Sequence, residues 1–187
     1  MTDVRAGPVP EPVQAADPLA ALVAHDPQAW QDLFEGYYRK LYNFAYVRTG
    51  DVSASEEIAA EVFAAAARGI SRYRPTGAPI GAWLYRIARN ITADHVDRRN
   101  KRPSISLDAA NLEIETAGPN IDDATDLARS VALLTPDQQE VIALRFFNDC
   151  TLQEAAAALG KSVGAVKLLQ HRALAALRRQ MARDAQP

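Results

Sequence analysis

Apolar residues recur every three or four positions in three successive stretches of the first half of the chain, the spacing of one face of an α-helix. Asp26-Pro27 precedes the first stretch and is typical of a helix start, because aspartate caps a helix and proline fits its first turn. Ser53 and Glu56 form a capping-box pattern before the second stretch. We expect a third helix from about residue 81 to 102, where a proline ends it. The inward positions expected for the three helices are Trp30, Leu33, Phe34, Tyr37, Leu41 and Phe44; Ile58, Val62, Phe63, Ala66 and Ile70; and Trp83, Leu84, Ile87, Ile91 and His95.

The helical pattern stops between residues 103 and 127, which are acidic and carry Gly118-Pro119 in their middle. A connection of this length is uncommon inside one compact domain, so we interpret it as a flexible linker between two domains. Residues 1–18 contain four prolines and few large apolar residues, and we expect them to be a disordered lead. The two expected domains are therefore residues 19–102 and 128–183.

Two capping boxes open the helices predicted in the second half of the chain. The first is residues 135–138, Thr-Pro-Asp-Gln, and the second is residues 151–154, Thr-Leu-Gln-Glu. No stretch alternates apolar and polar residues as a half-buried strand would. The sequence therefore predicts an all-α fold. The core positions expected between the two boxes are Val141, Ile142, Leu144 and either Phe146 or Phe147.

Residues 152–178 have the layout of a helix-turn-helix. A short helix ends at Gly160, which can adopt the left-handed conformation that terminates a helix. A longer helix, about residues 163–179, follows Ser162 as its cap, and Ala156 is small enough to lie where the two helices cross. We expect Leu159, Val166 and Leu169 to contact the core, and the outward candidates are Lys167, Gln170, His171, Arg172 and Leu174.

Charge is separated along the chain, although the net charge is only −2. Residues 86–102 hold six Lys or Arg against two Asp, and residues 167–183 hold five Lys or Arg and no acid. Residues 103–128 between them hold six acids and no Lys or Arg. This pattern predicts two anion-binding surfaces on either side of an acidic segment.

The composition excludes several classes of protein. No apolar run approaches the ~18 residues of a membrane span, and residues 1–18 lack the pattern of a secretory signal. Cys150 is the only cysteine, which excludes an intrachain disulfide and a cysteine-based zinc site. The chain has no P-loop, no glycine-rich dinucleotide turn and no cluster of metal ligands. We therefore expect a cytoplasmic protein that is no enzyme and has no cofactor, no metal and no membrane insertion, with no regulatory domain after Pro187.

Several sequence blocks together resemble one family. Residues 134–145, followed by residues 151–156 and 164–167, resemble region four of bacterial sigma factors. Residues 83–90 (Trp-Leu-Tyr-Arg-Ile-Ala-Arg-Asn) are similar to the end of region two in the extracytoplasmic-function class, and residues 55–63 resemble the acidic helix by which region two docks on polymerase. The blocks stand in the order of that class, where a linker replaces the middle domain of larger sigma factors.

The resemblance implies a subunit that gives promoter recognition to RNA polymerase and initiates transcription of stress- or signal-responsive genes. Region four would read the upstream (−35) element as duplex through Lys167, Gln170, His171 and Arg172, with Ser162 and Arg178 at phosphates. Region two would read the downstream (−10) element as a single strand, with Asn90 at a base pocket and Asp94 one turn later. Trp83 is expected in the core rather than as a stacking platform. The cations expected to bind that strand are Arg86, Arg89, Arg98, Arg99, Lys101 and Arg102.

The same resemblance implies protein partners. Glu56, Glu57 and Glu61 would face core RNA polymerase, whose β′ clamp helices and β flap are the expected contacts, and an anti-sigma factor is the expected inhibitor. The chain differs from the usual pattern at Ala60, where Gln is common, and near Ala67, where Trp is common, so fewer hydrogen bonds to polymerase are expected.

Three other interpretations stay open at this point. A helix-turn-helix regulator that acts without polymerase would share residues 152–178 but would not need residues 55–63 and 83–90. An adaptor would use only the acidic helix. An enzyme is disfavoured, because the three histidines (His25, His95 and His171) are far apart in sequence.

Overall fold

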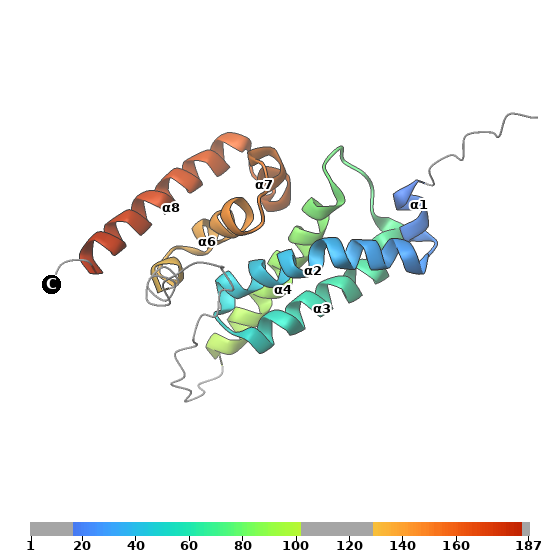
Figure 1. The fold of residues 1–187 in the computed structure, drawn as a ribbon, viewed down its shortest axis with the longest axis horizontal. Helices are drawn as coiled ribbons and strands as arrows, with labels where there is room; N and C mark the ends of the chain where they lie inside the picture. The colour runs from blue at the N-terminus through green and yellow to red at the C-terminus, as the bar shows by residue number, and fades with distance from the viewer. Residues whose placement is uncertain (1–16, 102–128, 185–187) are drawn as a thin grey trace, which may run out of the picture.

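The computed structural model describes residues 17–101 and 129–184, in two helical bodies. The N-terminal body (residues 17–101) consists of α1 (Pro18–Val23), α2 (Pro27–Thr49), α3 (Val52–Gly69), the short 3₁₀ helix η1 (Ile70–Arg72) and α4 (Ile80–Lys101). The C-terminal body (residues 129–184) contains α6 (Pro136–Ile142), the π-helical turn η2 (Ala143–Phe147), α7 (Leu152–Leu159) and α8 (Val163–Asp184). Neither described range contains a strand. The prediction of an all-α fold with two helical bodies is confirmed (Figure 1).

Local capping determines where the helices of the N-terminal body begin. The side chain of Asp26 accepts a hydrogen bond from the amide of Ala29 at 2.9 Å, as predicted. The predicted capping box at Ser53 and Glu56 is wrong, because Asp51 caps α3 instead and lies outside the box. Helix α1 was not predicted, and it begins at Pro18, inside the expected lead. Residues 1–16 of that lead and the expected linker 103–127 lie outside the described residues.

Helices α2, α3 and α4 form the core of the N-terminal body and run side by side (Figure 1). Burial of apolar side chains between them is the main source of their stability, because an isolated helix is only marginally stable in water. Phe34 is an exception to the predicted pattern: it is 44% exposed and its ring lies 4.9 Å from that of Phe63. The central residues with less than 2% exposure are Leu41, Phe44, Ile58, Val62, Ile70 and Leu84.

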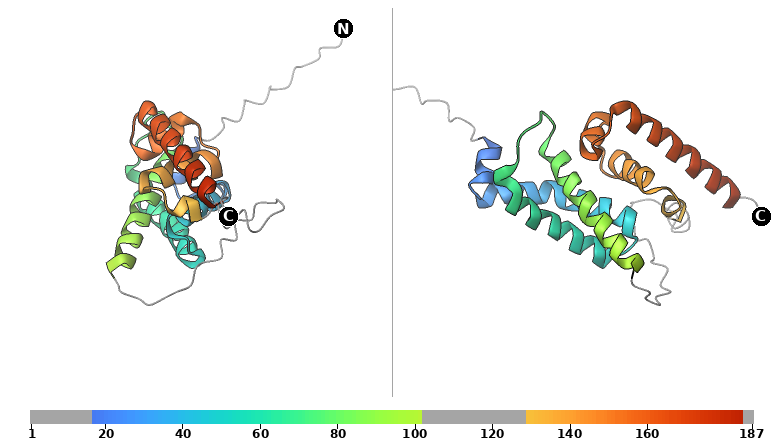
Figure 2. Two further views of the ribbon diagram at one scale, coloured as in Figure 1. Left: turned by 90° about the vertical axis from the view of Figure 1, so that its left-hand side faces the viewer. Right: turned by 180° about the vertical axis from the view of Figure 1, so that it is seen from behind.

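One continuous apolar cluster joins the two bodies. Tyr85 and Ala88 of α4 are buried together with Ala155 and Leu159 of α7. These two α4 residues and the buried Thr92 were absent from the predicted core, which contained Trp83, Ile87, Ile91 and His95 instead, and those four are only half-buried. Helix α4 therefore has a second buried face that contacts the C-terminal body, and both views of Figure 2 show that body lying against α2 and α4.

The helix-turn-helix has the predicted form. Helix α7 ends at Gly160, which has a φ of +63°, and Val166 of α8 is fully buried. Helix α8 is longer than expected and continues to Asp184. Leu174 was expected to face outward, but it packs against a second apolar cluster. Phe146 is 51% exposed, so of the two candidate core phenylalanines only Phe147 contacts that cluster, which consists of Val131, Leu134, Ile142, Ala173 and Leu177.

Gly160→Ala is expected to lower the free energy of unfolding by roughly 1 kcal/mol, since a left-handed conformation is unfavourable for a residue with a Cβ. A Cβ at Gly160 would meet no atom within 4 Å, so the backbone is the only source of the loss. Gly164→Ala is the matched control: it also has open space, but it lies inside α8, where alanine is the better helix former. Urea denaturation measures both, and equal effects would contradict the expectation.

Candidate nucleic-acid interface

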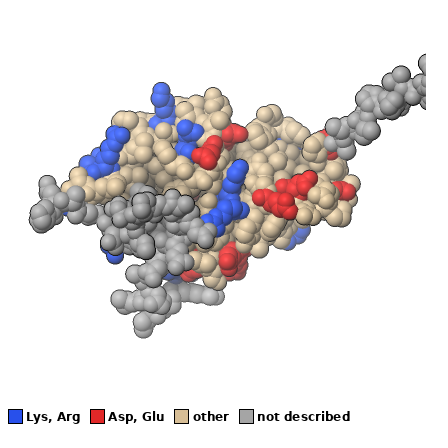
Figure 3. All heavy atoms as spheres, in the orientation of Figure 1, with Lys and Arg blue, Asp and Glu red and all other residues tan. Residues whose placement is uncertain are grey.

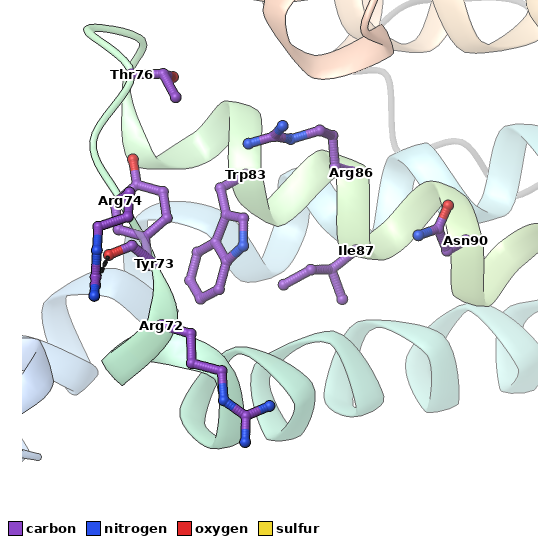
Figure 4. A pocket seen from close by; sticks show the side chains of 8 residues that line it. All are labelled: Arg72, Tyr73, Arg74, Thr76, Trp83, Arg86, Ile87 and Asn90. Atoms are coloured by element: carbon purple, nitrogen blue, oxygen red, sulfur yellow. Dashed lines mark hydrogen bonds between the residues drawn. The ribbon is translucent and has the colours of Figure 1, made fainter.

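An open pocket lies between α4 and the segment that follows α3, with Asn90 at its edge. Its volume is about 470 Å³, and Figure 4 shows the Trp83 indole beside Ile87, with Asn90 farther along α4. The rings of Tyr73 and Trp83 lie 4.8 Å apart. Asn90 is exposed, and its amide makes no hydrogen bond within the described residues. The residues lining the pocket are Arg72, Tyr73, Arg74, Thr76, Trp83, Arg86, Ile87 and Asn90.

The chemistry of this pocket suits a flat aromatic ligand with negative charge beside it. Tyr73 and Trp83 provide aromatic surface, and an exposed amide offers a donor and an acceptor. Trp83 both lines the pocket and packs against the apolar cluster, so its expected place in the core is only part of its role. Four pocket residues from the segment after α3 were absent from the predicted site: Arg72, Tyr73, Arg74 and Thr76. Their signal in the sequence was a pair of arginines on either side of a tyrosine, directly before a loop rich in proline and glycine.

The C-terminal end of α4 carries the other predicted cations. Arg98 donates to the backbone oxygen of Asp94, one turn earlier, at 3.2 Å. Arg99 donates to the backbone oxygen of Thr49 at 3.3 Å and its side chain also pairs with that of Asp51 at 3.8 Å. The side chains of Arg86, Asp94, Arg98, Arg99 and Lys101 are all exposed, whereas Arg102 lies outside the described residues.

Arg89 differs from these cations because it contacts the C-terminal body. Its Nε lies 3.0 Å from Oε2 of Glu140, and its Nη2 lies 3.6 Å from the carboxylate of Asp137. Its Nη1 also donates to the backbone oxygen of Leu159 at 3.3 Å. In this arrangement, Arg89 is bound by carboxylates of the helix-turn-helix body and is not available to a nucleic-acid strand.

Glu140 is the centre of an ion cluster between the two bodies. Nη1 of Arg48, at the end of α2, donates to Oε1 of Glu140 at 2.9 Å, and the two side chains are 9% and 3% exposed. Burial raises the pKa of the Glu140 carboxyl, while Arg89 and Arg48 oppose that rise. Asp137 belongs to the same cluster through its pair with Arg89, and it also pairs with Lys161 of its own body at 3.0 Å. We refer to Arg48, Arg89, Asp137 and Glu140 as the interbody ion cluster.

The outward face of α8 is the second candidate interface. Lys167, His171 and Arg172 are exposed, as is Arg178 two turns later. The exposed Ser162 accepts a hydrogen bond from the amide of Ala165 at 3.2 Å and so caps the helix, as predicted. Figure 3 shows Lys and Arg side chains gathered over the end of the molecule where α8 lies, with carboxylates gathered toward the α1 end.

Gln170 lies differently from its predicted neighbours. It is half-buried, and its Oε1 accepts a hydrogen bond from Nε of Arg145 at 3.1 Å. Arg145 is itself fixed by a hydrogen bond to the backbone oxygen of Cys150. The amide acceptor of Gln170 is therefore already used inside the C-terminal body.

The predicted polymerase-binding carboxylates lie on α3. Glu56, Glu57 and Glu61 are exposed, and so is Ala60 beside them. Ser55 in the same block is fully buried, with its hydroxyl 2.6 Å from the backbone oxygen of Asp51. The structure therefore leaves an acidic helix face open next to a well-packed helix start.

Residues 17–101 and 129–184 lack two further kinds of feature. None of their helices is both long and apolar enough to cross a membrane. No group of three or more His, Cys, Asp or Glu side chains in these residues is arranged to hold a metal ion.

Comparison with known proteins places this fold in a family. Models of Sigma-70 region 2 and Sigma-70 region 4 match residues 33–102 and 131–179. The chain is 33% identical over 168 residues to the ECF RNA polymerase sigma factor BldN of Streptomyces coelicolor, covering 87% of this chain and 64% of BldN. It is 30% identical over 172 residues to the ECF RNA polymerase sigma factor SigW of Bacillus subtilis, covering 83% of this chain and 90% of SigW.

A solved structure shares the fold. The sigma factor RpoE in complex with the anti-sigma factor NepR, from Bartonella quintana, superposes with a TM-score of 0.66 at 23% identity, over 81% of this chain and 95% of RpoE. Both helical bodies match sigma-70 regions in their order along the chain, and the match to SigW covers 90% of that sigma factor. The chain therefore belongs to the extracytoplasmic-function (ECF) RNA polymerase sigma factors, which are transcription initiation factors and not enzymes.

Proposed function

We propose that the chain directs core RNA polymerase to promoters by reading a downstream element as a single strand beside Asn90 and an upstream element as duplex with α8. The observation that carries this proposal is the Asn90 pocket, where an unpaired amide, aromatic surface and several guanidinium groups meet on one exposed site. Residues 19–102 would act as region two and residues 128–183 as region four, with the acidic linker between them.

The downstream reading depends on a base that leaves the stack. Asn90 would hydrogen-bond the edge of that base, while Trp83 and Tyr73 offer it aromatic surface. Arg72, Arg74 and Arg86 surround the same pocket and would neutralise the phosphates of the strand. Farther along α4, the strand would meet the exposed cations Arg98, Arg99 and Lys101 together with Asp94. Arg89 would join them only after it leaves Glu140 and Asp137, and Arg102, which lies outside the described residues, completes the predicted set.

The upstream reading depends on the exposed face of α8 in the major groove. Lys167 can donate to guanine, His171 and Arg172 lie on the next turn, and Ser162 and Arg178 would contact phosphates. Gln170 would contribute only through its amide nitrogen, because its oxygen accepts from Arg145.

The partners follow from the family and from the exposed acidic face of α3. Glu56, Glu57 and Glu61 would dock on the β′ clamp helices of core polymerase, and the C-terminal body would contact the β flap. Since RpoE was solved with an anti-sigma factor, we propose that an anti-sigma protein also inhibits this chain. Its place of action would be the cytoplasm, where polymerase and promoter DNA meet.

The test is reconstitution with purified core polymerase, followed by run-off transcription on promoter fragments enriched from the genome of its source. Specific transcripts that depend on the chain would support the proposal. Polymerase binding with no transcript would favour an adaptor, and specific duplex binding with no effect on polymerase would favour a stand-alone regulator.

Replacing Lys167 and Arg172 together by alanine is expected to weaken upstream-element binding and to reduce the slope of log affinity against log salt by about 2, because each cation removed from the DNA surface releases about one counterion fewer on binding. Fluorescence anisotropy at several salt concentrations measures both quantities. Arg39→Ala with Arg68→Ala is a charge-matched control, since these exposed arginines lie on the other body and outside the Asn90 pocket. An unchanged slope in the Lys167 and Arg172 variant would contradict the role of α8.

A further inference from the structure

Leu168 is an apolar side chain in the middle of a charged, DNA-facing surface. It is 49% exposed, and it lies next to Lys167 and on the same helix face as His171 and Arg172, three and four residues later. The buried side of α8 at this level is formed by Val166 and Ala173, which have no exposed surface. Leu168 belongs to neither apolar cluster, so the fold itself does not require a leucine at this position.

Gln170, the polar residue two positions after Leu168, does not place its amide oxygen on this exposed face. The side-chain oxygen of Gln170 is bonded to Arg145, which directs that amide toward the C-terminal body. The centre of the exposed face therefore offers a groove ligand a branched apolar group, with cations beside it at Lys167 and Arg172.

Leu168 is also isolated from the other exposed apolar residues of α8. Val163 lies five residues earlier, which places it about 140° around the helix. Met181 lies 13 residues later, about 20 Å along the axis. Neither extends Leu168 into a continuous stripe, and a protein partner that docks through apolar surface would need one. An isolated leucine among cations is therefore better suited to a polar, anionic ligand that carries one small apolar group than to an apolar protein surface.

We propose that Leu168 contacts the C5-methyl group of a thymine in the upstream element and so contributes to sequence specificity. This inference rests on the proposed reading of duplex by α8. The thymine methyl is the apolar group on the major-groove edge of the bases, and cytosine and adenine do not offer it there. Removing that methyl would leave Leu168 partly hydrated in the complex, which weakens binding without removing any hydrogen bond.

The experiment deletes the methyl from the DNA and the isobutyl group from the protein. The full chain with core polymerase selects its upstream element from a randomised duplex library, and each thymine of the selected element is then replaced by uracil. We expect one such replacement to weaken binding by wild type about fourfold, the effect of burying one methyl-sized group. Leu168→Ala should bind the thymine and uracil duplexes equally at that position.

Met181→Ala is the matched control, because it removes an equally exposed apolar side chain from the same helix and should keep the fourfold preference. A thymine preference that survives in Leu168→Ala, or its absence in wild type, would overturn the inference. So would loss of polymerase binding in Leu168→Ala with DNA selection unchanged, since that result assigns the leucine to a protein contact. If no specific duplex is selected, or if the Lys167 and Arg172 double variant binds the selected element like wild type, the proposed function itself fails.

Discussion

Arg48→Glu is expected to increase the rate at which Cys150 reacts with an aromatic disulfide reagent by at least about tenfold. Cys150 is the only thiol of the chain and is buried in a pocket between the bodies, with Tyr37 and Tyr85 on one side and Glu154 on the other. A reagent can reach the thiol when the C-terminal body moves away from α2 and α4. The reaction rate therefore reports how often the bodies separate.

The size of the effect follows from the interbody ion cluster. Glutamate at position 48 would face Glu140 at the site where a guanidinium now lies 2.9 Å from it. Loss of one partner of a buried ion pair costs about 3–5 kcal/mol, and repulsion between two carboxylates adds to it. With the bodies apart, residue 48 would be at the surface of the N-terminal body, so the same change should leave that body folded.

Arg68→Glu is the control for the change in net charge, because Arg68 is exposed on α3 and should leave the thiol as slow to react as in wild type. Far-UV circular dichroism separates opening from unfolding, since opening keeps the helices. A rate for Arg48→Glu equal to that of wild type would show that the ion cluster does not hold the bodies together.

Under the proposed function, this closed arrangement cannot bind a promoter through both bodies. Elements about 25 base pairs apart are separated by about 85 Å along the duplex, whereas a compact chain of this size is about 40 Å across. Arg89 also cannot serve a single strand while it is paired with Glu140 and Asp137. The bodies must therefore separate before both can bind a promoter. The free energy needed to break the interbody contacts lowers the apparent promoter affinity by the same amount.

Features that depend on nearby residues could be predicted from the sequence. The cap at Asp26, the capping box at residues 151–154 and the helix end at Gly160 each rest on contacts within four or five positions, and all are found. The cap of α3 was misassigned because Asp51 and Ser53 both suit that position, and only the backbone geometry selects Asp51.

Long-range contacts could not be predicted in the same way. Arg48 and Glu140 are 92 positions apart, and no periodicity links them. Tyr85 and Ala88 were missed because the pattern described only one inward face of α4, whereas α7 packs against this helix as well and both residues belong to the cluster that joins the two bodies. Similarly, Gln170 lies on the expected helix, but the bond to Arg145 that turns it inward joins two helices.

Asn90→Ala is expected to reduce the fraction of promoter DNA that opens by roughly 10- to 100-fold, because a bidentate contact to a base edge is worth about 1–3 kcal/mol. Asn90 is exposed beside the aromatic pocket and its side-chain amide makes no hydrogen bond within the described residues, so truncation of that side chain should not disturb the fold. Permanganate reactivity of unpaired thymines in the downstream element, measured with reconstituted polymerase, gives the opened fraction directly.

The experiment must distinguish base reading from assembly, and two comparisons do so. Binding of Asn90→Ala to core polymerase should equal that of wild type, since the carboxylates expected at that interface lie on α3. Asn100→Ala removes an exposed amide from the same helix about 15 Å farther along, and it should open promoters normally. Weak polymerase binding by Asn90→Ala would move this residue from the DNA site to the protein interface. Normal opening by Asn90→Ala would instead show that this amide does not read the base, and it would assign selection to the hydrogen-bonding groups of Arg72, Arg74, Arg86 and Thr76, because stacking on a ring discriminates poorly among bases.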